Sequence, residues 1–187
     1  MNQLTDDRQL IAGIALQDQS ALSALIARHQ VRVFRFIARL VRNEAIAEEL
    51  TNEVFLEAWR NARNFEGRSS PSTWLLSIAH NKAVSQLRKR REESWNDEQA
   101  QEIADTDDDP EVVAQKTDKS AAMRRCLAGL SAEHREIIDL VYYHEQSIAE
   151  VSAVLGIPEA TVKTRMFYAR KKLSELLKAA GIDRGWP

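Results

Sequence analysis

The sequence predicts an all-α protein: two small helical domains joined by a flexible acidic linker, the C-terminal domain containing a helix-turn-helix. Glycine and proline are scarce, with 6 and 4 among 187 residues, and no Asn-Gly or Asp-Gly pair occurs. That scarcity argues against a turn-rich β-sandwich or barrel. Apolar residues instead recur every three or four positions along most of the chain, which is the helical period. A hydrophobic content of 44% is enough for packed cores.

Charge is distributed unevenly, although the whole chain carries only −2. Residues 1–91 carry a net +5, residues 92–119 carry −9, and residues 120–187 carry +2. Two basic segments therefore flank a strongly acidic one, and basic segments favour a polyanionic partner such as nucleic acid. We expect domains at 1–92 and 120–187, with the linker at 93–119.

Several classes of protein are excluded by what the sequence lacks. The single cysteine, Cys126, rules out an internal disulfide framework and a thiolate zinc site made by this chain alone. No apolar run approaches 18 residues, and polar residues are spread through positions 1–19, so neither a membrane span nor a signal peptide is predicted. We expect a cytoplasmic protein.

Four helices are expected in the first domain. Three of them cover residues 6–17, 20–42 and 44–62. A loop follows at 64–70, and a fourth helix begins with Ser70 as N-cap and Pro71 just inside the start, where helices accept proline. We expect this helix to end near Arg91. Its inner stripe is Leu75, Ala79, Ala83 and Leu87.

The helical pattern fails from Glu92 to about Asp109. This stretch has no apolar period and many like charges, so it cannot bury enough surface to offset the entropy lost on ordering. It is predicted to be a flexible linker. Helical periodicity returns from Glu111.

The second domain contains the helix-turn-helix. Ser131 is the expected N-cap of a helix, Gly156 ends a short helix, and Pro158 starts the last one after a turn of a few residues. The inner stripe of the last helix is Val162, Met166, Ala169, Leu173 and Leu177. Val151, Leu155, Ile157 and Val162 should form the small core that fixes the angle between the two helices, and Ser152 should lie where they approach most closely.

The exposed side of the last helix carries polar, basic and aromatic residues. Residues near the N-terminus of such a helix reach base edges in the major groove, and basic residues hold phosphates. The alternative is a solvated face of an ordinary helical bundle. The residues concerned are Glu159, Thr161, Lys163, Thr164, Arg165, Phe167 and Tyr168.

A second basic face lies on the fourth helix, with aromatic residues beside it. Its members are Asn81, Lys82, Ser85, Arg88 and Lys89, and Trp74, Phe65 and Arg68 lie near its start. Aromatic rings next to a cationic groove suit the stacking of single-stranded bases, at about 1–3 kcal/mol per base. Without further context the two aromatic residues could equally be core residues.

An acidic edge runs along the third helix. Glu49, Glu53 and Glu57 repeat every four residues beside Asn52. Such a ladder could be a metal site, a solvated face or a docking edge for a basic protein. A metal site in a helical bundle would require Glu-x-x-His, and none of the four histidines has a glutamate three residues before it. No phosphate-binding glycine loop or catalytic motif occurs, so we expect no cofactor, no metal and no enzymatic activity.

These motifs resemble those of bacterial sigma factors of the extracytoplasmic-function (ECF) type, which contain only regions 2 and 4 of the sigma-70 family. Residues 47–59 and 65–81 resemble region 2. Residues 130–131, 148–151 and 156–165 resemble region 4. Two departures occur: Ser85 stands where the family usually has aspartate, and Ala160 where it usually has glycine.

The resemblance implies a transcription initiation subunit with RNA polymerase core and promoter DNA as partners and no small-molecule substrate. The first domain would dock on the clamp helices of the polymerase and recognise and melt the −10 element. The second would dock on the flap and read the −35 element. The resemblance also implies an inhibitory anti-sigma factor, often membrane-anchored. It further implies a role in stress or envelope responses.

The resemblance also implies roles for individual residues. Glu49, Asn52 and Glu53 become the polymerase-docking edge. The −10 surface comprises Phe65, Arg68, Ser69, Trp74, Asn81, Lys82, Ser85 and Arg88. The −35 surface comprises Glu159, Thr161, Lys163, Thr164, Arg165, Phe167, Tyr168 and Arg170, with the two arginines on phosphates. The alternatives are an autonomous dimeric helix-turn-helix regulator and a helical adaptor whose basic faces are merely solvated.

Overall fold

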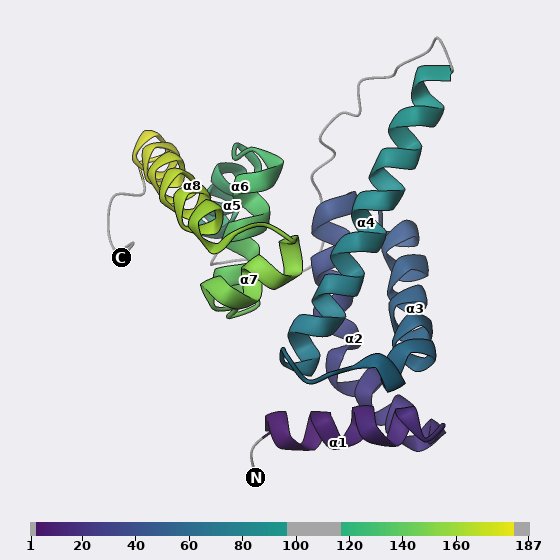
Figure 1. Ribbon diagram of the computed structural model, residues 1–187. Coiled ribbons are helices and arrows are strands. Elements are labelled where there is room, and N and C mark those ends of the chain that lie inside the picture. Colours follow the sequence, from purple (N-terminus) through teal and green to yellow (C-terminus); the bar gives the residue numbers. More distant parts are fainter. Residues whose placement is uncertain (1–2, 97–116, 182–187) are drawn as a thin grey trace.

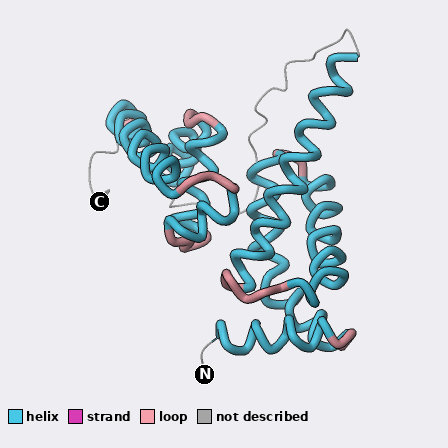
Figure 2. Tube along the Cα trace, viewed as in Figure 1, coloured by secondary structure: helices cyan, strands magenta, loops and turns pink. Residues whose placement is uncertain are grey.

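The structure, a computed structural model, describes residues 3–96 and 117–181. All regular structure within these two ranges is helical, and neither contains a strand (Figure 2). This confirms the all-α prediction. The linker prediction falls mostly on residues 97–116, and the tail after Gly181 carries Trp186; both lie outside the described residues.

The N-terminal bundle contains four long helices and a short 3₁₀ helix, η1 (Figure 1). Its elements are α1 (Gln3–Ala15), α2 (Gln19–Val41), α3 (Glu44–Asn61), η1 (Ala62–Asn64) and α4 (Pro71–Asn96). Helix α2 is central, since it packs on α1, α3 and α4. Leu25, Phe36, Val54 and Leu75 are fully buried where these helices meet.

Side-chain caps fix the starts of these helices. Asp18 accepts a hydrogen bond from the Ser20 backbone N–H at 2.8 Å, so α2 starts one residue before the expected position. Ser70 Oγ accepts from the Thr73 N–H at 3.1 Å, which confirms Ser70 as the cap of α4. Because a cap satisfies a backbone donor that the helix leaves free, these residues set the helix boundaries.

Helix α4 differs from the prediction at its C-terminal end. It continues to Asn96 instead of ending near Arg91. Glu92 lies four residues after Arg88, a spacing at which opposite charges stabilise a helix, and this favours the extension. The end of α4 extends past its neighbours (Figure 1), so Leu87, assigned to the inner stripe, is 39% exposed. The placement of Leu87 in the core was therefore wrong.

The C-terminal bundle contains α5 (Thr117–Ala128), α6 (Ala132–Ile138), a π-helical segment η2 (Asp139–Tyr143), α7 (Ile148–Leu155) and α8 (Glu159–Ala179). In η2 the His144 N–H donates to the Asp139 carbonyl at 3.1 Å, five residues back. Ser131 caps α6 as predicted, through a 3.3 Å bond from the His134 N–H.

The helix-turn-helix prediction is confirmed in α7 and α8. Gly156 ends α7 in the left-handed region with φ 65°, a conformation that side chains disfavour. Ser152 Oγ donates to the Ile157 carbonyl at 2.6 Å and closes the turn between the helices. All five residues of the predicted inner stripe of α8 are buried: Val162, Met166, Ala169, Leu173 and Leu177. In the small core of the motif, Val151 and Val162 are fully buried, whereas Leu155 and Ile157 are half-buried.

The two bundles contact one another, chiefly through α7 packing on α4 (Figure 1). The sequence did not predict this contact. Within the described residues, no helix is long and apolar enough to cross a membrane.

Candidate nucleic-acid interface

Helix α8 presents a row of exposed side chains opposite its buried stripe. Phe167 and Tyr168 are 64% and 53% exposed, unusually open for large aromatic residues, and their rings meet edge to face at 5.4 Å. Exposed aromatic rings beside basic residues are typical of a surface that meets a partner. Burial of the opposite stripe fixes the direction in which these rings point.

The polar residues predicted for DNA binding on α8 are not all equally available. Lys163 and Thr164 are exposed, although the Thr164 hydroxyl donates to the Ala160 carbonyl at 3.0 Å. Arg165 is partly covered, and its Nε lies 3.5 Å from Glu133 Oε2 at the start of α6. Arg165 is therefore oriented by its own bundle. The remaining members are Glu159 and Arg170, both exposed, and Thr161, which is half-buried.

The two aromatic residues of the predicted −10 surface are Phe65, in the loop between η1 and α4, and Trp74, in the first turn of α4. The rings of Phe65 and Trp74 lie 5.0 Å apart at 46°, and both residues are half-buried against the core. Ser69 is half-buried, and the exposed Arg68 forms an ion pair with Glu66. Both rings therefore pack on the core and also keep part of their surface exposed. They fit both of the roles that the sequence left open, core residue and stacking surface.

Helix α1 supports this loop, a role that the sequence did not reveal. Arg8 Nη2 donates to the Gly67 carbonyl at 3.1 Å, and Arg63 Nε donates to the Ala15 carbonyl at 3.0 Å. Asp7, which is buried, accepts from Arg28 and pairs with His29, each at 2.8 Å. The charged residues of α1, which lie between apolar ones, indicate that this helix makes polar contacts. Their spacing does not show which residues they contact.

The exposed face of α4 contains Asn81, Ser85 and Arg88, as predicted. Lys82 is different, because its ammonium lies 3.0 Å from Glu53 Oε2 and 3.0 Å from Glu57 Oε2 on α3. Burial by itself lowers the pKa of Lys82, but the two carboxylates outweigh it and leave the pKa raised. Lys82 therefore stays charged, and it is held against α3.

The acidic edge of α3 is consequently shared between two predicted surfaces. Glu49 and Asn52 are exposed and free to meet a partner, whereas Glu53 is engaged by Lys82. The predicted polymerase edge and the predicted −10 face thus adjoin at one lysine. Among residues 3–96 and 117–181, no group of three or more His, Cys, Asp or Glu side chains could hold a metal ion.

Comparison with known proteins assigns the two bundles. The family Sigma-70 region 2 matches residues 25–93, and the family Sigma-70, region 4 matches residues 120–173. The ECF RNA polymerase sigma factor SigK of Mycobacterium ulcerans (strain Agy99) is 34% identical over 179 residues, covering 94% of this chain and 95% of that protein. The chain belongs to the ECF RNA polymerase sigma factors. SigK of Mycobacterium bovis (strain BCG / Pasteur 1173P2) is 33% identical over 173 residues, covering 90% and 91%.

Solved structures of sigma factors resemble this sigma factor over most of its length. CnrH, in complex with the cytosolic domain of CnrY, matches with a TM-score of 0.68 and 28% identity, covering 93% of this chain and 98% of that one. RpoE in complex with the anti-sigma factor NepR, from Bartonella quintana, matches with a TM-score of 0.68 and 27% identity, covering 87% and 98%. The family is not an enzyme class, and this chain acts in transcription initiation with RNA polymerase core and promoter DNA.

Proposed function

We propose that this sigma factor directs RNA polymerase to its promoters by reading two DNA elements with two separate helical surfaces. The observation that carries the proposal is the row of exposed side chains on α8. The helix-turn-helix, with its capping box, and the buried inner stripe fix the orientation of α8, so these side chains point into solvent. Lys163, Thr164, Phe167 and Tyr168 are the readers of the −35 element. Arg170 is a phosphate contact, and Arg165 supports the same face from its position beside Glu133.

The −10 surface comprises the Phe65–Ser70 loop and the exposed face of α4. Phe65 and Trp74 offer partly open ring surfaces on which an unstacked base can lie, while Arg68 and Arg88 supply positive charge. Extrusion of a base from the duplex costs a few kcal/mol, and stacking on a protein ring offsets about 1–3 kcal/mol of that cost. Asn81 and Ser85 are exposed hydrogen-bonding groups on the same helix.

Glu49 and Asn52 form the centre of the polymerase-docking edge on α3, with Glu53 beside them. Both are exposed, and a carboxylate row suits a basic surface of the polymerase. We infer further that an anti-sigma factor controls this chain, as in the complexes of CnrH with CnrY and of RpoE with NepR. Its site of action is the cytoplasm, where RNA polymerase works.

Run-off transcription with purified core polymerase tests the proposal. We expect promoter-specific transcripts from a genomic fragment library only when the protein is present. Replacing Lys163 and Thr164 with alanine should reduce discrimination at the upstream element, since each good base contact is worth about 1–3 kcal/mol. Lys178→Ala, an exposed lysine in the last turn of α8, is the matched control and should leave the promoter preference unchanged.

The same experiment separates this function from that of an autonomous regulator. A gel shift by the free protein without any new transcript would favour a helix-turn-helix protein that acts alone. Reversal of Glu49 and Glu53 to lysine should abolish polymerase binding while the helical content is kept. Unchanged polymerase affinity in that variant would remove the docking assignment.

A further inference from the structure

The buried stripe of α1 contains a charged residue. Ile11 and Ile14 are buried, and Asp7, four residues before Ile11, is only 4% exposed. The three residues share one face of the helix, because positions four and seven apart lie above one another. Burying a carboxylate is unfavourable unless it is paired and hydrogen-bonded. Position 7 therefore makes a demand on its surroundings that an apolar side chain would not make.

Both oxygens of the Asp7 carboxylate have partners on α2. Oδ1 accepts from Arg28 Nη1 at 2.8 Å, and Oδ2 lies 2.8 Å from His29 Nε2. Because an ionised carboxylate only accepts, His29 Nε2 carries the proton of this bond. His29 is itself buried, whereas the Arg28 side chain is 32% exposed. A carboxylate held at both oxygens by two consecutive residues of a neighbouring helix has one orientation. We call Asp7, Arg28 and His29 the α1 anchor.

The α1 anchor determines where the next residue points. Consecutive residues of an α-helix point about 100° apart, so holding Asp7 on α2 turns Arg8 toward another neighbour. Arg8 Nη2 donates to the Gly67 carbonyl at 3.1 Å, in the middle of the Phe65–Ser70 loop. Gly67 adopts φ 70°, and a Cβ there would lie 3.5 Å from Arg8 Nη1. The guanidinium therefore packs directly against the backbone of the loop.

The other end of α1 is held on the same two sides. Arg63 Nε of η1 donates to the Ala15 carbonyl at 3.0 Å, and Ala15 lies seven residues after Arg8, on the same side of the helix. Toward α2, a Cβ at Gly13 would lie 3.0 Å from Ala21 Cβ, closer than ordinary van der Waals contact, so the two backbones approach closely. Helix α1 thus connects α2 with η1 and the loop that follows it.

A charged anchor fixes an orientation better than it adds stability. Replacing a buried ion pair by apolar side chains of similar volume is often neutral or stabilising. An apolar residue at position 7 would bury the same face of α1, but hydrophobic burial is non-directional and tolerates small rotations of the helix. Bonds to both oxygens of the Asp7 carboxylate tolerate one rotation only. A carboxylate at this position therefore favours a role in aiming α1.

We propose that Asp7 and His29 are positioning residues for the capture of an unstacked −10 base. They hold α1 in the orientation that allows Arg8 to support the Phe65–Ser70 loop. Both residues are buried, so they act through Arg8 and not by touching DNA. The role in base capture rests on the proposed function of the loop, whereas the coupling of the α1 anchor to the loop does not.

Hydrogen–deuterium exchange of the full-length protein tests the coupling without DNA. Asp7→Asn keeps the side-chain shape but removes the charge, and it should speed exchange in peptides covering residues 65–70 about two- to tenfold, as expected for the loss of one hydrogen bond. The double variant Asp7→Asn/Arg8→Ala should exchange no faster than Arg8→Ala, because both changes act through one contact. Gln9→Ala, an exposed residue of the same helix, is the matched control and should leave the loop unchanged. Effects of Asp7→Asn and Arg8→Ala that multiply would overturn the coupling.

An apolar version of the α1 anchor separates orientation from stability. Asp7→Leu/His29→Leu should be at least as stable in urea as Asp7→Asn, with the helical content of the native protein, yet its loop should still exchange fast. Recovery of slow loop exchange together with stability would show a merely structural role and overturn the proposal. If this variant does not fold, His29→Ala is compared with His29→Gln, whose side-chain N–H replaces that of Nε2. The alanine should speed loop exchange and the glutamine should not, and equal exchange in the two would also overturn the proposal.

Permanganate footprinting tests the role in base capture, with core polymerase and a promoter recovered by run-off transcription. Asp7→Asn should lower the reactivity of −10 thymines about two- to tenfold, in step with the faster loop exchange, while the affinity for core polymerase stays the same. Native reactivity in a variant whose loop exchanges faster would refute the positioning role. Failure of the native protein to form any promoter complex would instead refute the proposed function and leave the exchange result standing.

Discussion

Glu150, three residues into the helix-turn-helix, is expected to make stability depend on pH in the acid range. The Ser147 N–H and hydroxyl donate to its Oε2 at 2.9 and 2.8 Å, and Ser147 Oγ accepts from the Glu150 N–H at 3.3 Å. This capping box starts α7. The Thr73 hydroxyl donates to the other oxygen, Oε1, from α4 at 2.9 Å.

These contacts set the direction of the pKa shift. Burial alone would raise the pKa of Glu150, but the hydrogen bonds from Ser147, Thr73 and Ser70 outweigh it and lower the pKa below its ordinary value of 4.5. A group whose pKa is lowered by folding stabilises the folded state above its unfolded-state pKa. That contribution should be complete above about pH 4.5 and disappear as the pH falls through the lower folded-state value.

Glu150→Gln keeps an acceptor oxygen but removes the charge, so it isolates this effect. A net hydrogen bond to a charged group is worth about 1.5–3 kcal/mol when shielded, and the partial exposure of Glu150 reduces the expected loss to about 1 kcal/mol at pH 7. For a chain of this length, that loss lowers Tm by about 2–4 °C. Glu150→Ala, which also removes the acceptors, should cost about 2 kcal/mol.

Urea unfolding at pH 7 and at pH 3.5 measures the effect. The free-energy difference between the native protein and Glu150→Gln should shrink toward zero at the lower pH, since glutamine does not titrate. Taking the difference cancels the other carboxylates, which titrate in both proteins. Glu145→Gln, an exposed carboxylate five residues earlier, should show no such change. A Glu150→Gln difference that stays constant from pH 7 to 3.5 would refute the reasoning.

Three further changes have defined outcomes. Leu173→Ala, at a fully buried position of α8, should lower the free energy of unfolding by about 2–5 kcal/mol in urea titrations monitored by circular dichroism. Arg8→Ala removes the hydrogen bond to the Gly67 carbonyl, worth about 0.5–1.5 kcal/mol, and should weaken capture of a melted −10 strand by about two- to tenfold in permanganate footprinting of the promoter complex. Core polymerase affinity should not change; a loss of both would contradict a role confined to the loop. Glu57→Gln removes one of the two carboxylates that hold Lys82 and should lower the pKa of that lysine, measured by NMR of its side-chain resonances; an unchanged pKa would contradict the pairing.

Periodicity and caps were sufficient to predict the long helices and the helix-turn-helix, but not where α4 ends or the π-helical segment η2. The buried stripe of α8, the Ser70 cap and the left-handed Gly156 all follow from local sequence, because each depends on residues within a few positions of one another. The capping box at Ser147 and Glu150 has the S-x-x-E spacing that identifies such a motif from local sequence. Leu87 was misplaced because a periodic stripe does not say where the neighbouring helices end.

The contacts between distant segments could not be predicted in this way. Arg32 and His144 are 112 residues apart, and nothing local in either helix names the other. Periodicity reports which side of a helix is buried, not what buries it. For the same reason Lys82 was assigned to DNA alone, and its attachment to the acidic edge of α3 emerged only with the fold. The assignment of Glu49, Asn52 and the DNA-contacting residues stays a prediction.

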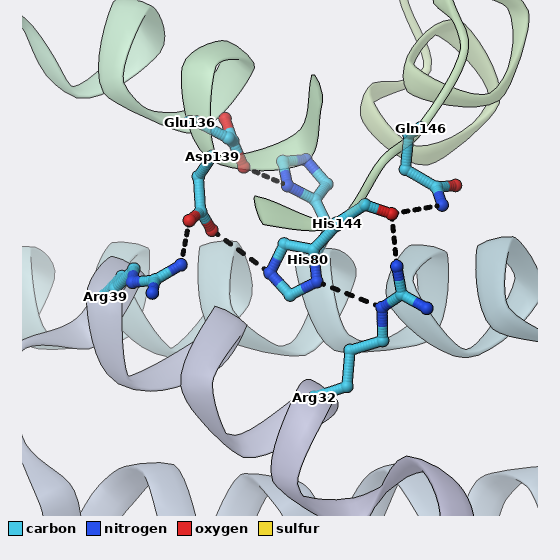
Figure 3. A network of polar contacts seen from close by, with 7 residues as sticks. All are labelled: Arg32, Arg39, His80, Glu136, Asp139, His144 and Gln146. Carbon is cyan, nitrogen blue, oxygen red and sulfur yellow. Dashed lines mark hydrogen bonds and ion pairs between the residues drawn. The ribbon is translucent and has the colours of Figure 1, made fainter. Parts of the chain in front are cut away.

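The π-helical turn of η2 has a consequence for the residues that follow it. Its wider loop holds one residue more than an α-helical turn, so the chain after Tyr143 is rotated relative to α6. Leu140 at the start of this turn is fully buried, while His144 and Gln146 after it contact Arg32 and Thr73 of the other bundle. Deletion of a single residue here would restore an ordinary α-helical turn and rotate the histidine and the glutamine by about 100° relative to α6. The alignment of His144 with Arg32 (Figure 3) therefore depends on the one extra residue in this turn.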